Sequence, residues 1–166
     1  MRRNKGLPGG NHRAATPAYT WAPGVDGPSL SYVTKPITKT LAMAGTGSVD
    51  LWISSSATDS DVQVTLSEVM PDGQERYVQN GFLKLSHRKL DRDRSTELNP
   101  YHSDEVQDMR DLIPGKFVSA RVALFPFAHP FRAGGRLRLT LQPPGGRRPQ
   151  WRFPPAVTNR RAGHAR

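Results

Sequence analysis

The sequence predicts an all-β fold, an antiparallel β-sandwich of about eight strands. Short runs of β-branched and apolar residues begin at Leu30, and turn residues separate these runs every ten or so positions, which is typical of sandwiches and barrels. Eight strands would suit the jelly-roll type of sandwich. With 166 residues, the chain is long enough for one domain of ordinary size around a single core.

The runs of strand-forming residues predict seven strands and a weaker eighth. Their expected ranges are 30–34, 39–44, 48–54, 62–70, 75–85, 117–125, 136–142 and, for the weaker one, 150–153. Alternation is clearest in the range 136–142, because every second residue there is a leucine. The leucines would share one face of that strand, while arginine and threonine side chains point to the other face.

The range 62–70 contains a break in its alternation. Apolar residues keep to one face until Glu68 takes the next inward position. We expect a β-bulge near Ser67 or Glu68 to restore the phase. The Pro-Asp-Gly sequence at 71–73 predicts a hairpin turn, because proline presets φ and glycine permits a positive φ. The strands on either side of this turn should therefore be neighbours.

The segments outside the strands differ in composition. Residues 1–27 are rich in Gly, Pro, Asn and Thr, so we expect a flexible arm or the remnant of a linker. Residues 28–154 would form the sandwich domain, and residues 155–166 a disordered basic tail. The charged stretch 89–115 predicts a long connection with one helical turn around 104–112.

The net charge of +10 lies at the two ends of the chain. Residues 1–13 hold four basic and no acidic side chains, and residues 132–166 hold nine basic and no acidic ones. The chain has no cysteine, which excludes disulfides and thiolate metal sites. No signal peptide or membrane span is evident in this sequence, so a cytoplasmic location is the default expectation.

The sequence lacks the nucleophile of an α/β-type serine hydrolase. Such an enzyme holds its serine on a sharp turn within a Gly-x-Ser-x-Gly motif, which does not occur in this chain. The nearest match is Gly47-Ser48, which opens an expected strand and is interpreted as a turn. We therefore expect no catalytic residue in this chain.

The other candidate bases and metal ligands have simple structural interpretations. Four histidines are expected to be surface or terminal residues, namely His12, His87, His102 and His164. The pairs Asp59/Asp61 and Asp91/Asp93 have the spacing of oxygen ligands for calcium, but each pair lacks the further acidic positions of a calcium loop. Turn-forming and solvating roles are favoured, and we expect neither a metal nor a cofactor.

His129 is the strongest candidate among the histidines. The segment "PFAHPFRAGGRLRL" places it among aromatic residues at an expected corner. We expect a mainly structural role, with the imidazole hydrogen-bonded at this corner and with Phe125, Phe127 and Phe131 packed around it. A contact with a neighbouring catalytic domain is the alternative.

Two blocks of the sequence resemble a known family. The blocks "SVDLWISSSATDSDVQVTLSEVMPDGQERYVQNGFLKLSHR" and "FVSARVALFPFAHPFRAGGRLRLTLQ" resemble the carboxy-terminal jelly-roll domain, which is galactose-binding-like, of X-Pro dipeptidyl-peptidase and cocaine-esterase type serine hydrolases. In these enzymes an α/β-hydrolase domain carries the catalytic triad. The resemblance implies that this chain packs against such a domain, walls one side of its substrate cleft and supports assembly.

The resemblance also implies which residues meet the partner. Candidate interface or cleft-lining residues are Trp52, Phe127, His129, Phe131 and Arg132. The catalytic domain, absent here or on a separate chain, would cleave an amide after proline or an ester through an acyl-enzyme. The isolated chain is expected to be inactive and to self-associate through an exposed apolar patch.

Two other classes of protein stay open. A free-standing carbohydrate-binding jelly roll would use Trp52, Trp151 or Tyr101 as a stacking platform. A nucleic-acid-binding module would need the two basic ends to act together, and its affinity would fall steeply with salt. The basic carboxy end mixes arginines with aromatics but lacks the pattern of a known nucleic-acid module, so this class is the weaker one.

Overall fold

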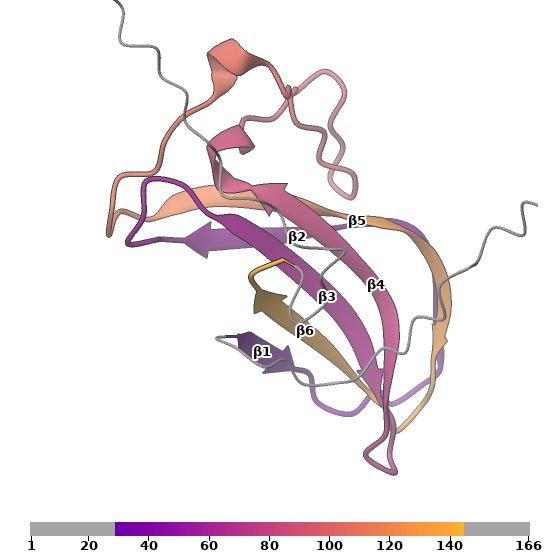
Figure 1. Cartoon of the computed structure of the whole chain (residues 1–166). Coiled ribbons are helices and arrows are strands. Elements are labelled where there is room, and N and C mark those ends of the chain that lie inside the picture. Colours follow the sequence, from indigo (N-terminus) through magenta and orange to yellow (C-terminus); the bar gives the residue numbers. More distant parts are fainter. Residues whose placement is uncertain (1–28, 145–166) are drawn as a thin grey trace, which may run out of the picture.

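Two antiparallel sheets face each other in the computed structural model, which describes residues 29–144 (Figure 1). The first sheet has the strand order β1-β6-β3-β4, and the second pairs β2 with β5. The strands are β1 (Leu30–Val33), β2 (Leu41–Ile53), β3 (Asp61–Val69), β4 (Glu75–Lys84), β5 (Val118–Phe131) and β6 (Arg136–Gln142). The predicted all-β antiparallel sandwich is confirmed. The expected arm 1–27, eighth strand 150–153 and tail 155–166 lie outside the described residues.

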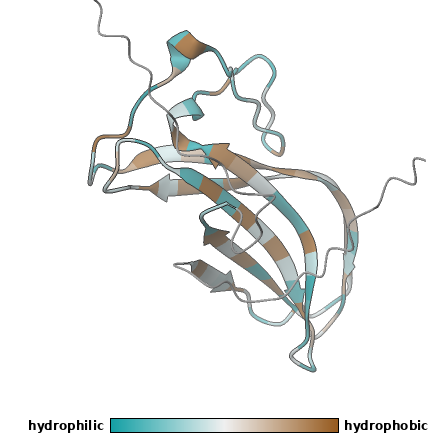
Figure 2. Cartoon of the chain, viewed as in Figure 1, coloured by the Kyte–Doolittle hydropathy of each residue, from teal (hydrophilic) through white to brown (hydrophobic). Residues whose placement is uncertain are grey.

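The core fills the space between the two sheets. Strand residues alternate between apolar and polar along the sheets, as Figure 2 shows, so that one face of each sheet is apolar. The most deeply buried core side chains include Val64 of β3 and Val122 and Phe131 of β5. In β6 the leucines pack against this cluster as the sequence predicts.

The structure has one strand, β2, where the sequence predicts two. The ranges 39–44 and 48–54, expected as two strands, form one strand that pairs with β5 from Leu41 to Ile53. The glycines between them suggest a turn in the sequence, but Gly45 uses its positive φ of 125° within the strand. The register shifts there, because Thr46 alone lies opposite Phe125 and Pro126. The glycines therefore accommodate a β-bulge.

Strand β5 is longer than the sequence predicts. The range 117–125 was expected to end before a corner at His129, but the strand continues to Phe131. Its prolines are tolerated because, among residues 29–144, β5 has one neighbour in its sheet, so that one edge of the strand makes no ladder hydrogen bonds there. The chain turns only after Phe131, where Gly134 has a φ of 84° and the Gly135 N–H donates to the Arg132 carbonyl oxygen at 3.0 Å.

A bulge is present at the level expected, near Ser67, but it belongs to the neighbouring strand. The register between β3 and β4 does shift after Leu66, but the extra residue is Val78 on β4. Strand β3 keeps its phase against β6 without a break. As a result, Glu68 itself faces inward and is buried with an exposure of 1%.

The hairpin between β3 and β4 follows the sequence prediction. Gly73 has a φ of 83°, and its N–H donates to the Met70 carbonyl oxygen at 2.9 Å. The Asp72 carboxylate accepts a hydrogen bond from the Gln74 N–H at 3.0 Å. The turn therefore makes β3 and β4 neighbours, as predicted.

The two sheets meet closely on one side only. Strand β4 lies against β5 there, and a Cβ added at Gly81 would lie 2.0 Å from the Ala123 carbonyl oxygen. On the same side, the Gln79 amide donates to the Pro126 carbonyl oxygen at 3.1 Å. The opposite side is formed by β1 and β2, the two strands at the other edges of the sheets.

The long connection between β4 and β5 runs at one end of the sandwich (Figure 1). It contains two short 3-10 helices, η1 (Leu85–His87) and η2 (Val106–Asp108). The helical turn expected around 104–112 is therefore present as η2. No helical segment in the part of the chain that the structure describes is long and apolar enough to cross a membrane.

Candidate functional site

A buried carboxylate ties the end of β5 to β3. Glu68 Oε2 lies 2.8 Å from His129 Nε2. Glu68 Oε1 accepts a hydrogen bond from the Arg132 backbone N–H at 2.7 Å. Both partners come from the far end of β5 and the turn after it, because the β5 bulge rotates His129 onto the inner face. We call Glu68, His129 and Arg132 the Glu68 cluster.

The Glu68 cluster keeps its carboxylate ionised. Burial by itself would raise the pKa of Glu68, since it disfavours the charged form. The hydrogen bonds from the Arg132 N–H and the His129 ring outweigh burial and hold the pKa of Glu68 below its ordinary value. A charged acceptor that satisfies two donors is a stable arrangement in a protein interior.

The contacts of His129 are those of a residue that stabilises the fold. Its ring packs edge-on against Phe131 with the centroids 4.7 Å apart. Its Nε2 is engaged by Glu68, and within residues 29–144 no hydroxyl group hydrogen-bonds to the imidazole. The hydroxyl of Ser67, the residue before Glu68, donates to Glu75 of β4 at 2.5 Å. The arrangement orients a strand end and does not pair a nucleophile with a base.

The structure separates the five predicted site residues. His129, Phe131 and Arg132 come together around Glu68, where Phe131 is fully buried and the Arg132 side chain is exposed. Phe127 is half-buried in a cavity between the sheets. Trp52 lies elsewhere, on the outer face of β2, with an exposure of 70%. Sequence reasoning missed Glu68, although its inward phase in β3 was the signal that could have identified it.

The aromatic environment expected around His129 is only partly present. Phe131 contacts the imidazole ring. Phe125 lies in the bulge and is exposed, with its ring tilted against Phe82 at 6.2 Å between centroids. The bulge therefore divides the phenylalanines of this segment between the two faces of the sheet.

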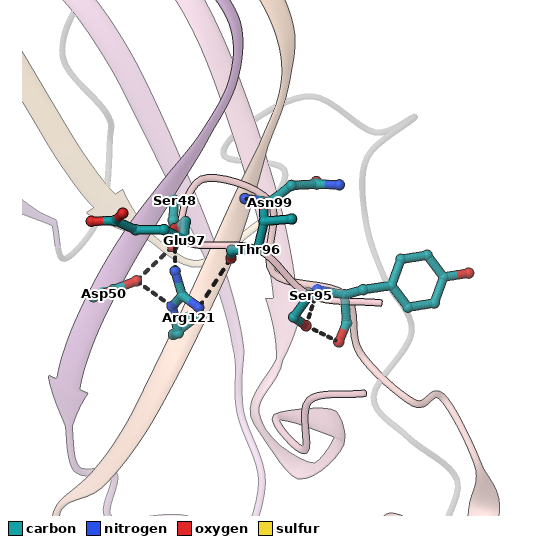
Figure 3. Close-up of polar contacts among 8 residues, drawn as sticks. Ser48, Asp50, Ser95, Thr96, Glu97, Asn99 and Arg121 are labelled. Carbon is teal, nitrogen blue, oxygen red and sulfur yellow. Dashed lines mark hydrogen bonds and ion pairs between the residues drawn. The ribbon is translucent and has the colours of Figure 1, made fainter. Parts of the chain in front are cut away.

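The outer face of the β2–β5 sheet holds the long connection through Arg121. Arg121 Nε donates to Asp50 Oδ1 at 2.8 Å, and its two terminal nitrogens donate to the carbonyl oxygens of Thr96 and Glu97 (Figure 3). The hydroxyl of Ser48 donates to the same Asp50 oxygen at 2.5 Å. The Ser48 hydrogen bond, opposed by some burial and helped by Arg121, lowers the pKa of Asp50. This clamp fixes the loop over the sheet.

Three exposed apolar residues lie near the end of β2. They are Trp52 on the outer face, and Ile113 and Phe117 in the segment that returns beside this end, with exposures of 70%, 58% and 58%. We call these three residues the Trp52 patch. Trp52 lies opposite Ser119, and Phe117 precedes Ser119 by two residues, so that Trp52 and Phe117 occupy diagonal positions. The Gly115 N–H donates to the Ser55 carbonyl oxygen at 2.8 Å, which fixes the Ile113–Phe117 turn beside the end of β2.

The acidic pairs expected to have structural roles bond to groups of this chain. Lys84 Nζ lies 2.7 Å from Asp59 Oδ2 and 3.8 Å from Asp61 Oδ1, so an amine occupies the position between them. Asp91 accepts hydrogen bonds from the backbone N–H groups of residues 93 and 94. Among residues 29–144, no three His, Asp or Glu side chains are grouped as metal ligands would be.

His102 differs from the expected surface residue. It pairs with Leu90 as an isolated β-bridge, and its Nε2 atom is buried. Burial lowers the pKa of His102, because it disfavours the imidazolium form.

The comparisons with known proteins agree on one relationship. A family model of the X-Pro dipeptidyl-peptidase C-terminal non-catalytic domain matches residues 9–156. Two proteins with the provisional name serine esterase, from Mycobacterium bovis and Mycobacterium tuberculosis, are each 29% identical over 118 residues. That match covers 70% of this chain but 19% of each relative. The chain therefore spans about a fifth of the curated relatives it matches.

Solved structures share the fold. A CocE/NonD family hydrolase from Staphylococcus aureus matches with a TM-score of 0.64 and 23% identity, over 69% of this chain and 22% of the hydrolase. An α-amino acid ester hydrolase matches with a TM-score of 0.54 and 25% identity, over 69% of this chain and 18% of that chain. In both cases the likeness covers a minor part of a much longer polypeptide.

Proposed function

Because the chain belongs to the X-Pro dipeptidyl-peptidase C-terminal non-catalytic domain family, we propose that it is the accessory sandwich of a serine hydrolase and packs against the catalytic domain. The observation that carries this proposal is the family match, which extends over residues 9–156. The catalytic domain would supply the nucleophile, since this sequence has no Gly-x-Ser-x-Gly motif.

The reaction class follows from the relatives. Serine esterases and ester hydrolases form and cleave an acyl-enzyme on their own nucleophile. The accessory domain contributes no group to that chemistry. Its role is to bury part of the catalytic domain's surface, to wall one side of the substrate cleft and to support assembly.

The Trp52 patch is the surface that fits this role best. Exposed tryptophan and phenylalanine side chains on a rigid sheet are typical of the centre of a protein interface. Arg121 and Asp50 hold the neighbouring loop in place, so the patch is preorganised for docking. Of the five residues predicted to meet the partner, Trp52 and Arg132 are exposed, and Trp52 is the exposed aromatic one, which favours a direct contact.

A chimera tests this proposal. The catalytic portion of the Mycobacterium tuberculosis relative would be expressed alone, with its own C-terminal region, and with this chain in place of that region. We expect the chimera to hydrolyse p-nitrophenyl esters faster, and to melt at a higher temperature, than the catalytic portion alone. A chimera no better than the catalytic portion would contradict the accessory role.

Point variants test the docking surface within the chimera. Trp52→Asp combined with Phe117→Asp places charge in the patch and is expected to lower the ester turnover about tenfold or more, as loss of a hot spot of about 2 kcal/mol would do. Val106→Ala is the matched control, because Val106 is an exposed apolar residue of η2 outside the patch. Equal effects of the two changes would assign docking to another surface.

Carbohydrate binding is the second candidate, and the exposure of Trp52 is the observation that favours it. The Tyr101 ring is a poorer platform, since the Arg94 guanidinium lies 3.4 Å from its centroid, and Trp151 lies outside the described residues. Affinity electrophoresis of the chain through soluble polysaccharides measures this function. Retardation that Trp52→Ala abolishes would support it, whereas unchanged mobility in all polysaccharides would oppose it.

A further inference from the structure

A basic pocket lies between the start of β5 and the first residues of the long connection. Its volume is about 310 Å³, at the lower end of the range for small-molecule sites. Among residues 29–144, no acidic side chain belongs to its lining. The polar side chains that line it are four cations and one hydroxyl residue, namely Arg88, Lys89, Arg92, Arg121 and Ser119. We call it the Arg88 pocket.

Arg88 is held in place without a carboxylate partner. Its Nη1 atom donates to the carbonyl oxygens of Leu85 at 2.9 Å and of Arg110 at 2.6 Å. Both acceptors are neutral, so no ion pair compensates the charge of this guanidinium. Its Nε and Nη2 atoms make no hydrogen bond within residues 29–144. A guanidinium that is fixed through one nitrogen can offer the others to an oxyanion with little further ordering.

Two exposed side chains of the pocket supply further donors. Arg92 is exposed on the long connection and forms no ion pair with any residue that the structure describes. Ser119 is exposed on β5, and its hydroxyl makes no hydrogen bond in the same part of the chain. The two side chains belong to different segments of the chain, so a small ligand in the pocket can contact both.

The other two cations already have carboxylate partners outside the pocket. Lys89 Nζ lies 2.5 Å from Asp108 Oδ1. Arg121 Nε lies 2.8 Å from Asp50 Oδ1, and its terminal nitrogens donate to backbone carbonyl oxygens (Figure 3). The pocket therefore holds two guanidinium charges without counterions, which is the charge that a dianion would balance.

We propose that the Arg88 pocket binds a dianionic oxyanion of the phosphate class. The planar N–H groups of arginine match the spacing of two phosphate oxygens. A concave site lined by one sign of charge also concentrates its potential. A phosphate monoester carries a charge of about −2 near neutral pH, which the two uncompensated guanidinium groups balance. This inference goes beyond the proposed function and does not depend on it, since every residue of the pocket belongs to this chain.

Titration of the isotope-labelled full chain with inorganic phosphate tests the site. Amide signals observed by NMR at constant ionic strength should show saturable shifts at residues 88–92 and 119–121. The expected apparent Kd is about 1 mM, as a few charge-assisted hydrogen bonds would give. Shifts that do not saturate, or that spread over the whole surface, would overturn the proposal. Acetate, which carries a single charge, should bind about tenfold more weakly, and equal binding of acetate would overturn the choice of a dianion.

Two variants distinguish a built site from diffuse attraction. Arg92→Gln with Ser119→Ala removes donors at exposed positions and is expected to weaken phosphate binding about tenfold. Arg76→Gln is the matched control, because it makes the same change of charge at an exposed position of β4 outside the pocket. It should weaken binding by less than about twofold. Equal weakening by the two changes would overturn the proposal.

The neighbour of the pocket separates two sources of the phosphate group. Ser119 lies opposite Trp52 in the β2–β5 ladder, so an aromatic ring attached to a bound phosphate would lie on the side of the indole. Phenyl phosphate is therefore compared with inorganic phosphate in the same titration. Tighter binding of phenyl phosphate with a shift of the Trp52 indole signal supports an organic phosphate ester as the ligand. Equal affinity without that shift supports the free ion.

Discussion

At the scale of single residues, the Glu68 cluster explains why the end of β5 is fixed. The sequence predicted that His129 would be hydrogen-bonded within the fold, but not its partner. Glu68 was assigned to a bulge because an inward carboxylate looks unfavourable in a strand. The bulge belongs to β4, and two donors from β5 make the inward carboxylate stable. Partners so far apart in the sequence cannot be predicted from local alternation.

Replacement of Glu68 by glutamine tests the cluster. Glu68→Gln keeps the shape of the side chain but removes the charge that the Arg132 N–H and His129 stabilise. We expect the free energy of unfolding to fall by about 1–3 kcal/mol, measured by urea denaturation. Glu105→Gln is the control, because Glu105 is exposed. An equal effect of the two substitutions would show that the buried carboxylate is not needed for stability.

Stability is expected to fall in acid. The pKa values of Glu68 and Asp59 are lowered in the folded chain, in each case by hydrogen bonds that outweigh burial. As the pH falls, the carboxylates of the unfolded chain therefore take up protons before those of the folded chain do. The contribution of these groups to the free energy of unfolding is fully present above the ordinary glutamate pKa of 4.5, and it declines as the pH falls toward the folded pKa values. Urea denaturation between pH 7 and pH 3 measures the decline, which should be shallower in Glu68→Gln. An identical pH profile for this variant would refute the assignment to Glu68.

His102 makes the free energy of unfolding begin to decline at a higher pH than the carboxylates do. Its folded pKa is lowered by burial, so the unfolded chain binds its proton first below the ordinary value of 6.5. The loss of stability from this group therefore begins before that of the carboxylates.

At the scale of elements, the strands were predicted better than their ends. Alternation and turn residues located most of the strands, and the Pro-Asp-Gly turn at 71–73 was confirmed. The glycines of β2 and the prolines of β5 suggested breaks where the structure has one continuous ladder. The bulge accommodates the glycines, and the prolines fit because β5 has one strand neighbour within the part of the chain that the structure describes. Neither property is visible in a single segment of sequence.

The substitution Gly81→Ala tests the close contact between β4 and β5. In Gly81→Ala the new Cβ would lie 2.0 Å from the Ala123 carbonyl oxygen, so β4 and β5 must move apart. We expect a loss of about 3 kcal/mol in thermal or urea unfolding. Gly73→Asn should cost less, because asparagine adopts a positive φ and the added Cβ meets no atom within 4 Å. A larger loss for Gly73→Asn would mean that the contact is looser than described.

The substitution Arg121→Ala tests whether Arg121 holds the connection between β4 and β5 against the β2–β5 sheet. Arg121→Ala removes the donors that hold the carbonyl oxygens of Thr96 and Glu97. Loss of about 1 kcal/mol would raise the open population of the loop about fivefold, so limited proteolysis between residues 92 and 99 should accelerate by that factor. Arg92→Ala, at an exposed position of the same loop, is the control. Equal cleavage rates in the two variants would argue against the clamp.

At the scale of the whole molecule, the all-β sandwich and its family could be predicted from the sequence. The unequal sides of the sandwich could not, because they depend on which strands of two different sheets approach each other. The Trp52 patch was predicted only through Trp52. Ile113 and Phe117 join it because the long connection returns beside β2, a contact that no sequence motif encodes.

The purified chain is expected to hydrolyse neither p-nitrophenyl esters nor Xaa-Pro p-nitroanilides. The physical reason is the absent Gly-x-Ser-x-Gly turn, together with a His129 ring that is already engaged by Glu68. Turnover that a serine-directed inhibitor abolishes would contradict this expectation. Self-association through the Trp52 patch stays a prediction, and sedimentation at high concentration measures it.

The two boundaries of the described fold emerge side by side, since Leu30 lies opposite Leu141. A unit with adjacent entry and exit points can be transplanted into a surface loop of an unrelated host without pulling the host's flanking residues apart. Because its two ends are adjacent, the described sandwich is suited to insertion within another domain as well as to fusion at a terminus.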